Sequence, residues 1–122
     1  MIGPHFNATD LLLSNYHGSR CLDPIPATGP GGGKNFECII DPLSAIQDIN
    51  TMAHGGWTQG SFGCSVASND TSNIAAALTL AATADVVVLA MGIDDSQERE
   101  GLDRTITTLP GVQTYVYMRV DE

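Results

Sequence analysis

The nine residues 84–92, ADVVVLAMG, decide the fold of this chain. They form an apolar run that is rich in valine and contains no polar residue after Asp85. β-Branched side chains favour strands, and a strand without polar alternation is one that other layers cover on both faces. The run therefore predicts a buried strand in a parallel sheet that is packed between helices.

Two helices are predicted before this strand. Apolar residues at helical spacing predict one helix over 73–83, directly ahead of the apolar run. Another helix, earlier in the chain, is predicted to start at Asp41 and Pro42, since aspartate is favoured as an N-cap and proline at the first helical position. Its apolar stripe ends before Gly55 and Gly56, residues typical of a helix end.

Shorter segments complete the pattern. The opening residues, MIGP, resemble the end of a strand, and residues 57–62, WTQGSF, alternate as a short strand does, with Trp57 expected to be buried. Strand, helix, strand, helix and strand in this order predict an α/β layered sandwich with a mainly parallel sheet, in one domain over residues 1–122. Residues 23–40 are rich in proline and glycine and predict a loop insertion.

Composition excludes several classes of function. The chain has 14 acidic and 5 basic residues and a net charge of −9, so we expect neither a nucleic-acid partner nor a membrane partner. No run approaches the roughly 20 apolar residues of a spanning helix, and the first residues lack the pattern of a signal peptide. Histidines and cysteines lack metal-ligand spacing, and GPGGGK at 29–34 lacks the phosphate-loop form, so no metal or cofactor is predicted.

Charge is concentrated in residues 94–104, DDSQEREGLDR, which we call the carboxylate loop. It follows the predicted strand directly, and ligands of parallel α/β sheets bind beyond the carboxyl ends of the strands. Composition alone favours a solvated surface loop, but this position makes the loop a candidate for chemistry. Its five acids surround two arginines: Asp94, Asp95, Glu98, Glu100 and Asp103 around Arg99 and Arg104.

The sequence ADVVVLAMGIDDSQEREGLDRTITTLPGVQ, residues 84–113, resembles the second domain of glycoside hydrolase family 3, in particular its β-xylosidase branch. Other motifs resemble that domain in the family's order: MIGPHFNATDLLLSNYHG at 1–18, DPLSAIQDI at 41–49 and FGCSV at 62–66. The resemblance covers nearly all of residues 1–113. By this comparison, residues 114–122 are an atypical tail.

The resemblance implies retaining glycoside hydrolysis, which needs a nucleophilic carboxylate and a carboxylic acid about 5–5.5 Å apart. In the family, the nucleophile lies on a preceding barrel domain, and the acid/base glutamate comes from the loop after this strand. Counting forward from the strand places Glu98 at the acid/base position, whereas counting back from residues 101–104 favours Glu100. We prefer Glu98, because its distance from the rigid strand end should set its reach. Loop support is assigned to Asp95, Arg99, Asp103 and Arg104.

Two functions are consistent with these features. The first is a fragment of a retaining β-xylosidase-like or β-glucosidase-like hydrolase, which supplies the acid/base loop and is inactive alone. Its partners are then the barrel domain of the parent enzyme and β-linked xylosides or related glycans. The alternative is a non-enzymatic module derived from that domain, which binds carbohydrate or self-associates through an unpaired sheet edge.

Family and sequons predict a secreted or extracellular protein. Asn7 and Asn69 begin N-x-[ST] sequons and are candidate glycosylation sites. Cys21, Cys38 and Cys64 are disulfide candidates, of which one remains unpaired if a single disulfide forms.

Overall fold

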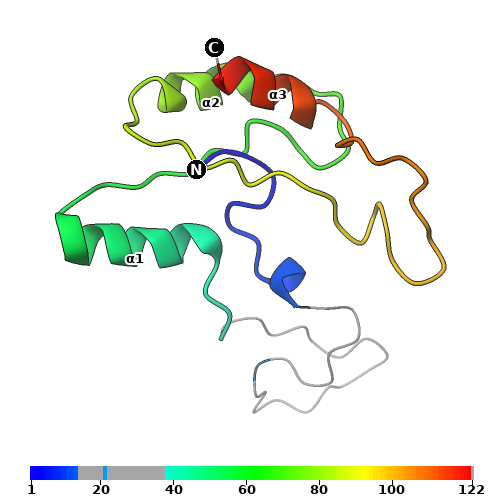
Figure 1. Ribbon diagram of the computed structural model, residues 1–122, viewed down its shortest axis with the longest axis horizontal. Coiled ribbons are helices and arrows are strands. Elements are labelled where there is room, and N and C mark those ends of the chain that lie inside the picture. The colour runs from blue at the N-terminus through cyan, green and yellow to red at the C-terminus, as the bar shows by residue number, and fades with distance from the viewer. Residues whose placement is uncertain (14–20, 22–37, 122) are drawn as a thin grey trace.

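The computed structural model describes residues 1–13, 21 and 38–121, and only the backbone of Met52 and His54. Most of the predicted insertion over 23–40 therefore lies outside the described residues. Figure 1 shows two helices on one side of the extended segments and a third on the other side. The elements are the 3-10 helix η1 (Asp10–Leu12), α1 (Pro42–His54), α2 (Ile74–Ala81) and α3 (Gln113–Val120).

Three extended segments meet at Ile2, which forms parallel bridges to Ser61 and to Leu89. The Ile2 amide donates to the Val88 carbonyl at 2.9 Å, and the Ala90 amide donates to the Ile2 carbonyl at 2.7 Å. The first segment therefore lies between the other two. In the part of the chain that the structure describes, β pairing is limited to isolated bridges. The layered sandwich with a mainly parallel sheet accordingly stays a prediction.

Two predictions about burial are wrong. The apolar run is not covered on both faces, since Val86 is 77% exposed and Val88 is 40% exposed. Among the described residues, only some side chains of this run, such as Leu89, pack against the buried core. Trp57 is 67% exposed rather than buried, because the segment that contains it pairs with Ile2 only farther along, at Ser61.

The core joins the extended segments to α2 and α3, which Figure 1 shows together on one side. Burial of apolar surface is the main favourable term here, and the side chains come from four separate parts of the sequence. Val116 of α3 is fully buried, so the segment predicted as an atypical tail contributes to the core. The five buried members of this cluster are Ile2, Cys64, Ile74, Ala77 and Val116.

The predicted boundaries of α1 are confirmed. The Asp41 carboxylate caps its start, accepting from the Ser44 amide at 3.0 Å and from the Ser44 hydroxyl at 2.6 Å. Gly55 ends the helix in the left-handed conformation. The Leu43 amide donates to the Phe6 carbonyl at 2.9 Å, which fixes the start of α1 to the first segment. The helix predicted over 73–83 forms as the shorter α2.

Two further features concern the whole chain. Cys21 and Cys38 are joined by a disulfide, and Cys64 is a free, buried thiol. Among the described residues, none of the helices has the length and apolar character required to cross a membrane.

Candidate active site

The carboxylate loop begins with a turn built on Asp94. The Asp94 carbonyl accepts from the Gln97 amide at 2.8 Å and from the Glu98 amide at 3.1 Å. Its carboxylate accepts from the Ser96 amide at 2.9 Å, the local pattern that aspartate favours in turns. Glu98 is therefore held one turn beyond the apolar run. The segment between the apolar run and α3 extends away from the helices in Figure 1.

A tight hairpin follows this turn. Arg99 and Leu102 exchange both backbone hydrogen bonds, at 3.0 and 2.9 Å, and form an antiparallel bridge. Gly101 has a φ of +75°, which glycine adopts at little cost. Glu100 lies beside it at the tip of the hairpin, whereas Glu98 precedes the bridge. The two candidate acids thus occupy different positions, one in the supported turn and one at the tip.

Arg104 closes the loop from its far end. Its Nη1 donates to Gln97 Oε1 at 2.8 Å, its Nε to the Ile106 carbonyl at 2.8 Å, and its Nη2 to the Thr108 carbonyl at 2.7 Å. The guanidinium group presents several donors in a fixed planar arrangement, so one side chain can hold three acceptors at once. Arg104 therefore orders the loop through neutral oxygens of the side chain and backbone.

The predicted site residues converge on one open depression of about 450 Å³. Arg99 lies there and donates from Nη1 to the Asp95 carbonyl at 2.7 Å. Glu98 and Glu100 are both exposed, so either carboxyl group is accessible to a ligand. The depression is lined by Leu11, Ile93, Asp94, Asp95, Glu98, Arg99, Glu100 and Asp103. Arg104 supports the loop from outside this lining.

One residue of the site was missed at the level of sequence. Gln113, the first residue of α3, is fully buried. Its Oε1 accepts from the Gly92 amide at 2.8 Å, and its Nε2 donates to the carbonyls of Gly92 and Val66, both at 2.7 Å. No helix was predicted over residues 113–120, so no pattern in the sequence pointed to the burial of Gln113 or to the backbone groups that its amide binds.

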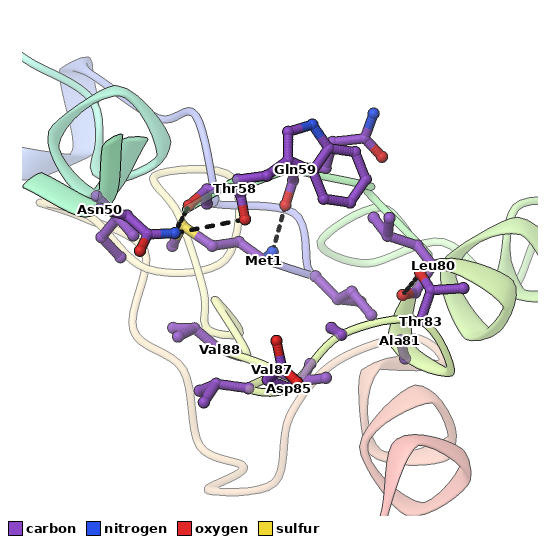
Figure 2. Close-up of a pocket in the computed structure, with 15 residues that line it drawn as sticks. Met1, Asn50, Thr58, Gln59, Leu80, Ala81, Thr83, Asp85, Val87 and Val88 are labelled. Atoms are coloured by element: carbon purple, nitrogen blue, oxygen red, sulfur yellow. Dashed lines mark hydrogen bonds between the residues drawn. The ribbon is translucent and has the colours of Figure 1, made fainter. Parts of the chain in front are cut away.

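A second cavity, of about 400 Å³, lies at the opposite ends of the extended segments, where Met1, Gln59 and Asp85 are found. Figure 2 shows Asn50 pointing toward Thr58 on one side of it, with the Asn50 Nδ2 donating to the Thr58 hydroxyl at 2.9 Å. Among the described residues that line it, Asp85 is the only one with a carboxylate. Since paired carboxyl groups carry glycoside hydrolysis, this cavity does not match that chemistry.

The remaining predicted residues lie elsewhere. Asn7 and Asn69 are exposed, and Cys64 is buried in the core away from the carboxylate loop. Within the ranges that the structure describes, no three histidine, cysteine, aspartate or glutamate side chains are grouped in a way that could hold a metal ion.

Known proteins resemble the chain over nearly its whole length. It is 37% identical to Beta-D-xylosidase 3 of Arabidopsis thaliana over 120 residues, which is 98% of this chain and 12% of that protein. It is 35% identical to the exo-1,4-beta-xylosidase xlnD of Aspergillus niger, over 93% of this chain and 11% of that protein. No family model matches.

A solved structure shows the same likeness in three dimensions. It is described as a GH3 exo-beta-xylosidase (XlnD) in complex with a xylobiose aziridine activity based probe. The TM-score is 0.71 at 30% identity, over 98% of this chain and 13% of that chain. The chain thus spans about one eighth of the length of the proteins that it matches.

Proposed function

Because this chain belongs to glycoside hydrolase family 3, as a segment that matches 12% of a xylosidase relative, we propose that it forms part of a larger retaining β-xylosidase. In this proposal the carboxylate loop supplies the general acid/base. Another part of the enzyme, the barrel domain by family resemblance, supplies the nucleophile. The observation that carries the proposal is a loop lined with carboxylates, directly after the apolar run, in a chain that matches xylosidases on both sides of that loop.

Glu98 is the proposed acid/base residue, and Glu100 is the alternative. The backbone of Glu98 is bound to the Asp94 carbonyl at 3.1 Å, close to where the loop leaves the apolar run. Glu100 lies farther along, at the tip of the hairpin between Arg99 and Leu102. General acid catalysis requires a carboxyl group within hydrogen-bond reach of the leaving oxygen, so the supported position favours Glu98.

The proposed step follows from this assignment. Protonated Glu98 donates its proton to the glycosidic oxygen as the bond to the anomeric carbon breaks and the nucleophile bonds to that carbon. The resulting carboxylate of Glu98 then accepts a proton from water, which attacks the covalent intermediate and restores both groups.

The test uses a hybrid enzyme in which this chain replaces the matching segment of the Arabidopsis xylosidase. Glu98→Gln should lower kcat/KM on phenyl xyloside roughly 10²- to 10⁴-fold, the usual contribution of general acid–base catalysis. Glu100→Gln is the matched control and should retain most activity. Full activity of the Glu98→Gln hybrid would reject the assignment, and loss only in Glu100→Gln would transfer it. The chain alone should not hydrolyse nitrophenyl xyloside.

A second candidate function is self-association. Val86 and Val88 are 77% and 40% exposed on an extended segment, and exposed apolar edges favour pairing with another chain. Light scattering should then show an oligomer that Val86→Lys dissociates. Calorimetric titration with xylose, xylobiose and glucose tests the related possibility of a sugar-binding module. A monomer that binds none of these sugars would exclude both.

We also propose that the protein is extracellular. The disulfide between Cys21 and Cys38 supports an oxidising compartment, and Asn7 and Asn69 are accessible to glycosylation. Secretion from a eukaryotic host should yield a form whose mass falls on treatment with an N-glycosidase. A single change at each sequon, Thr9→Ala or Thr71→Ala, should remove one glycan.

A further inference from the structure

We propose that Gln113 is a positioning residue for the acid/base loop, because its buried side-chain amide fixes Gly92, from which the loop departs. The inference rests on the proposed function, since it takes Glu98 to be the acid that must be positioned. It adds a role for a residue outside the loop, on a different element.

The hydrogen bonds of Gln113 engage both backbone groups of one residue. Its Oε1 accepts from the Gly92 amide at 2.8 Å, and its Nε2 donates to the Gly92 carbonyl at 2.7 Å. These two groups belong to the peptide planes before and after Gly92, so one side chain restrains both planes. The remaining N–H donates to the Val66 carbonyl at 2.7 Å, which ties Gly92 to the turn after Cys64.

Burial makes this restraint strong. Gln113 is 0% exposed, so a lost hydrogen bond would not be replaced by water without rearrangement. A buried polar group left without a partner is costly, which favours a single conformation of the amide. Val116, one turn farther along α3, is also fully buried and anchors the helix that carries Gln113.

His5, on the first extended segment, also lies close to Gly92. A β-carbon at Gly92 would lie 3.4 Å from His5 Cδ2 and 3.5 Å from His5 Nε2. The φ of Gly92, +155°, is a conformation that side chains rarely adopt. The His5 amide also donates to the Ala90 carbonyl at 3.2 Å, so the backbone of His5 lies beside the residues that lead to Gly92. His5 is thus at ordinary contact distance from that β-carbon position, and the hydrogen bonds of Gln113 are what restrain the peptide planes of Gly92.

Gly92 is linked to Glu98 through a short stretch of chain and one backbone hydrogen bond. Only Ile93 separates Gly92 from Asp94, and the Asp94 carbonyl binds the Glu98 amide directly. A rotation at Gly92 would therefore move the whole turn and displace the Glu98 carboxyl group. A displacement of about 1 Å can cost roughly 10²-fold in rate, so a residue that contacts no substrate can still control acid catalysis.

The first experiment uses the chain of 122 residues itself. Amide hydrogen exchange is measured by NMR in Gln113→Met, which keeps length and removes all three hydrogen bonds. Gln47→Met is the matched control, because the Gln47 Nε2 makes one bond to the Thr58 carbonyl, at 3.0 Å, from α1. Exchange at Gly92 and Glu98 should rise at least tenfold in Gln113→Met and not in Gln47→Met. Unchanged exchange at Glu98 would overturn the proposal.

The second experiment uses the hybrid xylosidase and separates positioning from general stability. Phenyl xyloside needs acid assistance because phenolate is a poor leaving group, whereas dinitrophenyl xyloside needs little. Gln113→Met should lower kcat/KM on phenyl xyloside by roughly 10- to 100-fold. It should lower kcat/KM on dinitrophenyl xyloside much less. Equal losses on both substrates would mean reduced folding alone and would overturn the proposal. Should Gln113→Met not fold, Gln113→Asn, which keeps a neutral amide but shortens its reach, is measured in the same way.

Glu98→Gln separates the two proposals. If the loss of kcat/KM in Glu98→Gln is the same for both leaving groups, the assignment of Glu98 fails and the inference fails with it. If the loss depends on the leaving group in Glu98→Gln but not in Gln113→Met, the acid assignment stands and only the positioning role is rejected.

Discussion

Arg104 donates from Nη1 to the Oε1 of Gln97 at 2.8 Å, and this contact ties the two ends of the carboxylate loop together. Gln97 lies in the turn that starts the loop, and Arg104 is its last residue. The same guanidinium group binds the carbonyls of Ile106 and Thr108. The two ends of the loop are therefore held together by hydrogen bonds from Arg104 to neutral acceptors.

The first prediction concerns this clamp. Arg104→Lys keeps the charge but loses the planar arrangement of donors, so it should loosen the loop almost as much as Arg104→Ala. We expect amide exchange at Leu102 to rise in both variants, while the free energy of unfolding falls by only about 1 kcal/mol. If the Leu102 amide of Arg104→Lys exchanged at the wild-type rate, the positive charge alone would be sufficient to order the loop.

The second prediction is a pH dependence at the start of α1. Hydrogen bonds from the Ser44 hydroxyl and then from the Ser44 amide hold the pKa of Asp41 below its ordinary value of 3.8. A carboxyl group with a lowered folded pKa adds stability above its unfolded pKa, and that stability is lost as the pH falls through the folded pKa. Asp41→Ala should therefore lower the free energy of unfolding by about 1 kcal/mol at neutral pH.

The same change should matter progressively less below a pH of roughly 4, where the wild-type carboxylate becomes protonated. Asp41→Asn is the control, since asparagine also caps helices but does not titrate. Urea unfolding measured at several pH values checks both statements. A cost of Asp41→Ala that is the same at every pH would contradict the proposed linkage.

The third prediction concerns the cysteines. Cys64 is buried, and burial raises the pKa of its thiol, so it should react slowly with a thiol reagent in the native protein. Under denaturing, non-reducing conditions one thiol should react, because Cys21 and Cys38 form the disulfide. Reducing that disulfide should lower the free energy of unfolding by about 3 kcal/mol, as expected for a loop of this length. Rapid labelling of Cys64 in the native state would contradict its burial.

Part of the fold was predictable because its causes are local. Asp41, Pro42 and Gly55 act within one helical turn of their own positions, and both boundaries of α1 were predicted correctly. The apolar spacing also located α2, although the helix ends earlier than predicted, at Ala81. The burial of Trp57 and Val86 was predicted wrongly, since burial depends on which distant segments pack against a side chain.

The candidate site also has features that the sequence predicted and features that it did not. The order of acids in the carboxylate loop, and its place directly after the apolar run, were visible in the sequence. The convergence of that loop on a single depression required the turn at Asp94 and the hairpin between Arg99 and Leu102. Neither contact has a periodic signature in the sequence, and so neither was predicted.

The sequence by itself determined the starts of α1 and α2, the acidic loop and the likeness to xylosidases, because these depend on the identity and spacing of neighbouring residues. Only the tertiary structure decided that Gln113 is buried against Gly92 and that Cys21 pairs with Cys38. Both relationships join residues far apart in the chain. The contact of Gln113 with Gly92 depends on the packing of α3, through Val116, onto the core around Ile2, which no local pattern specifies.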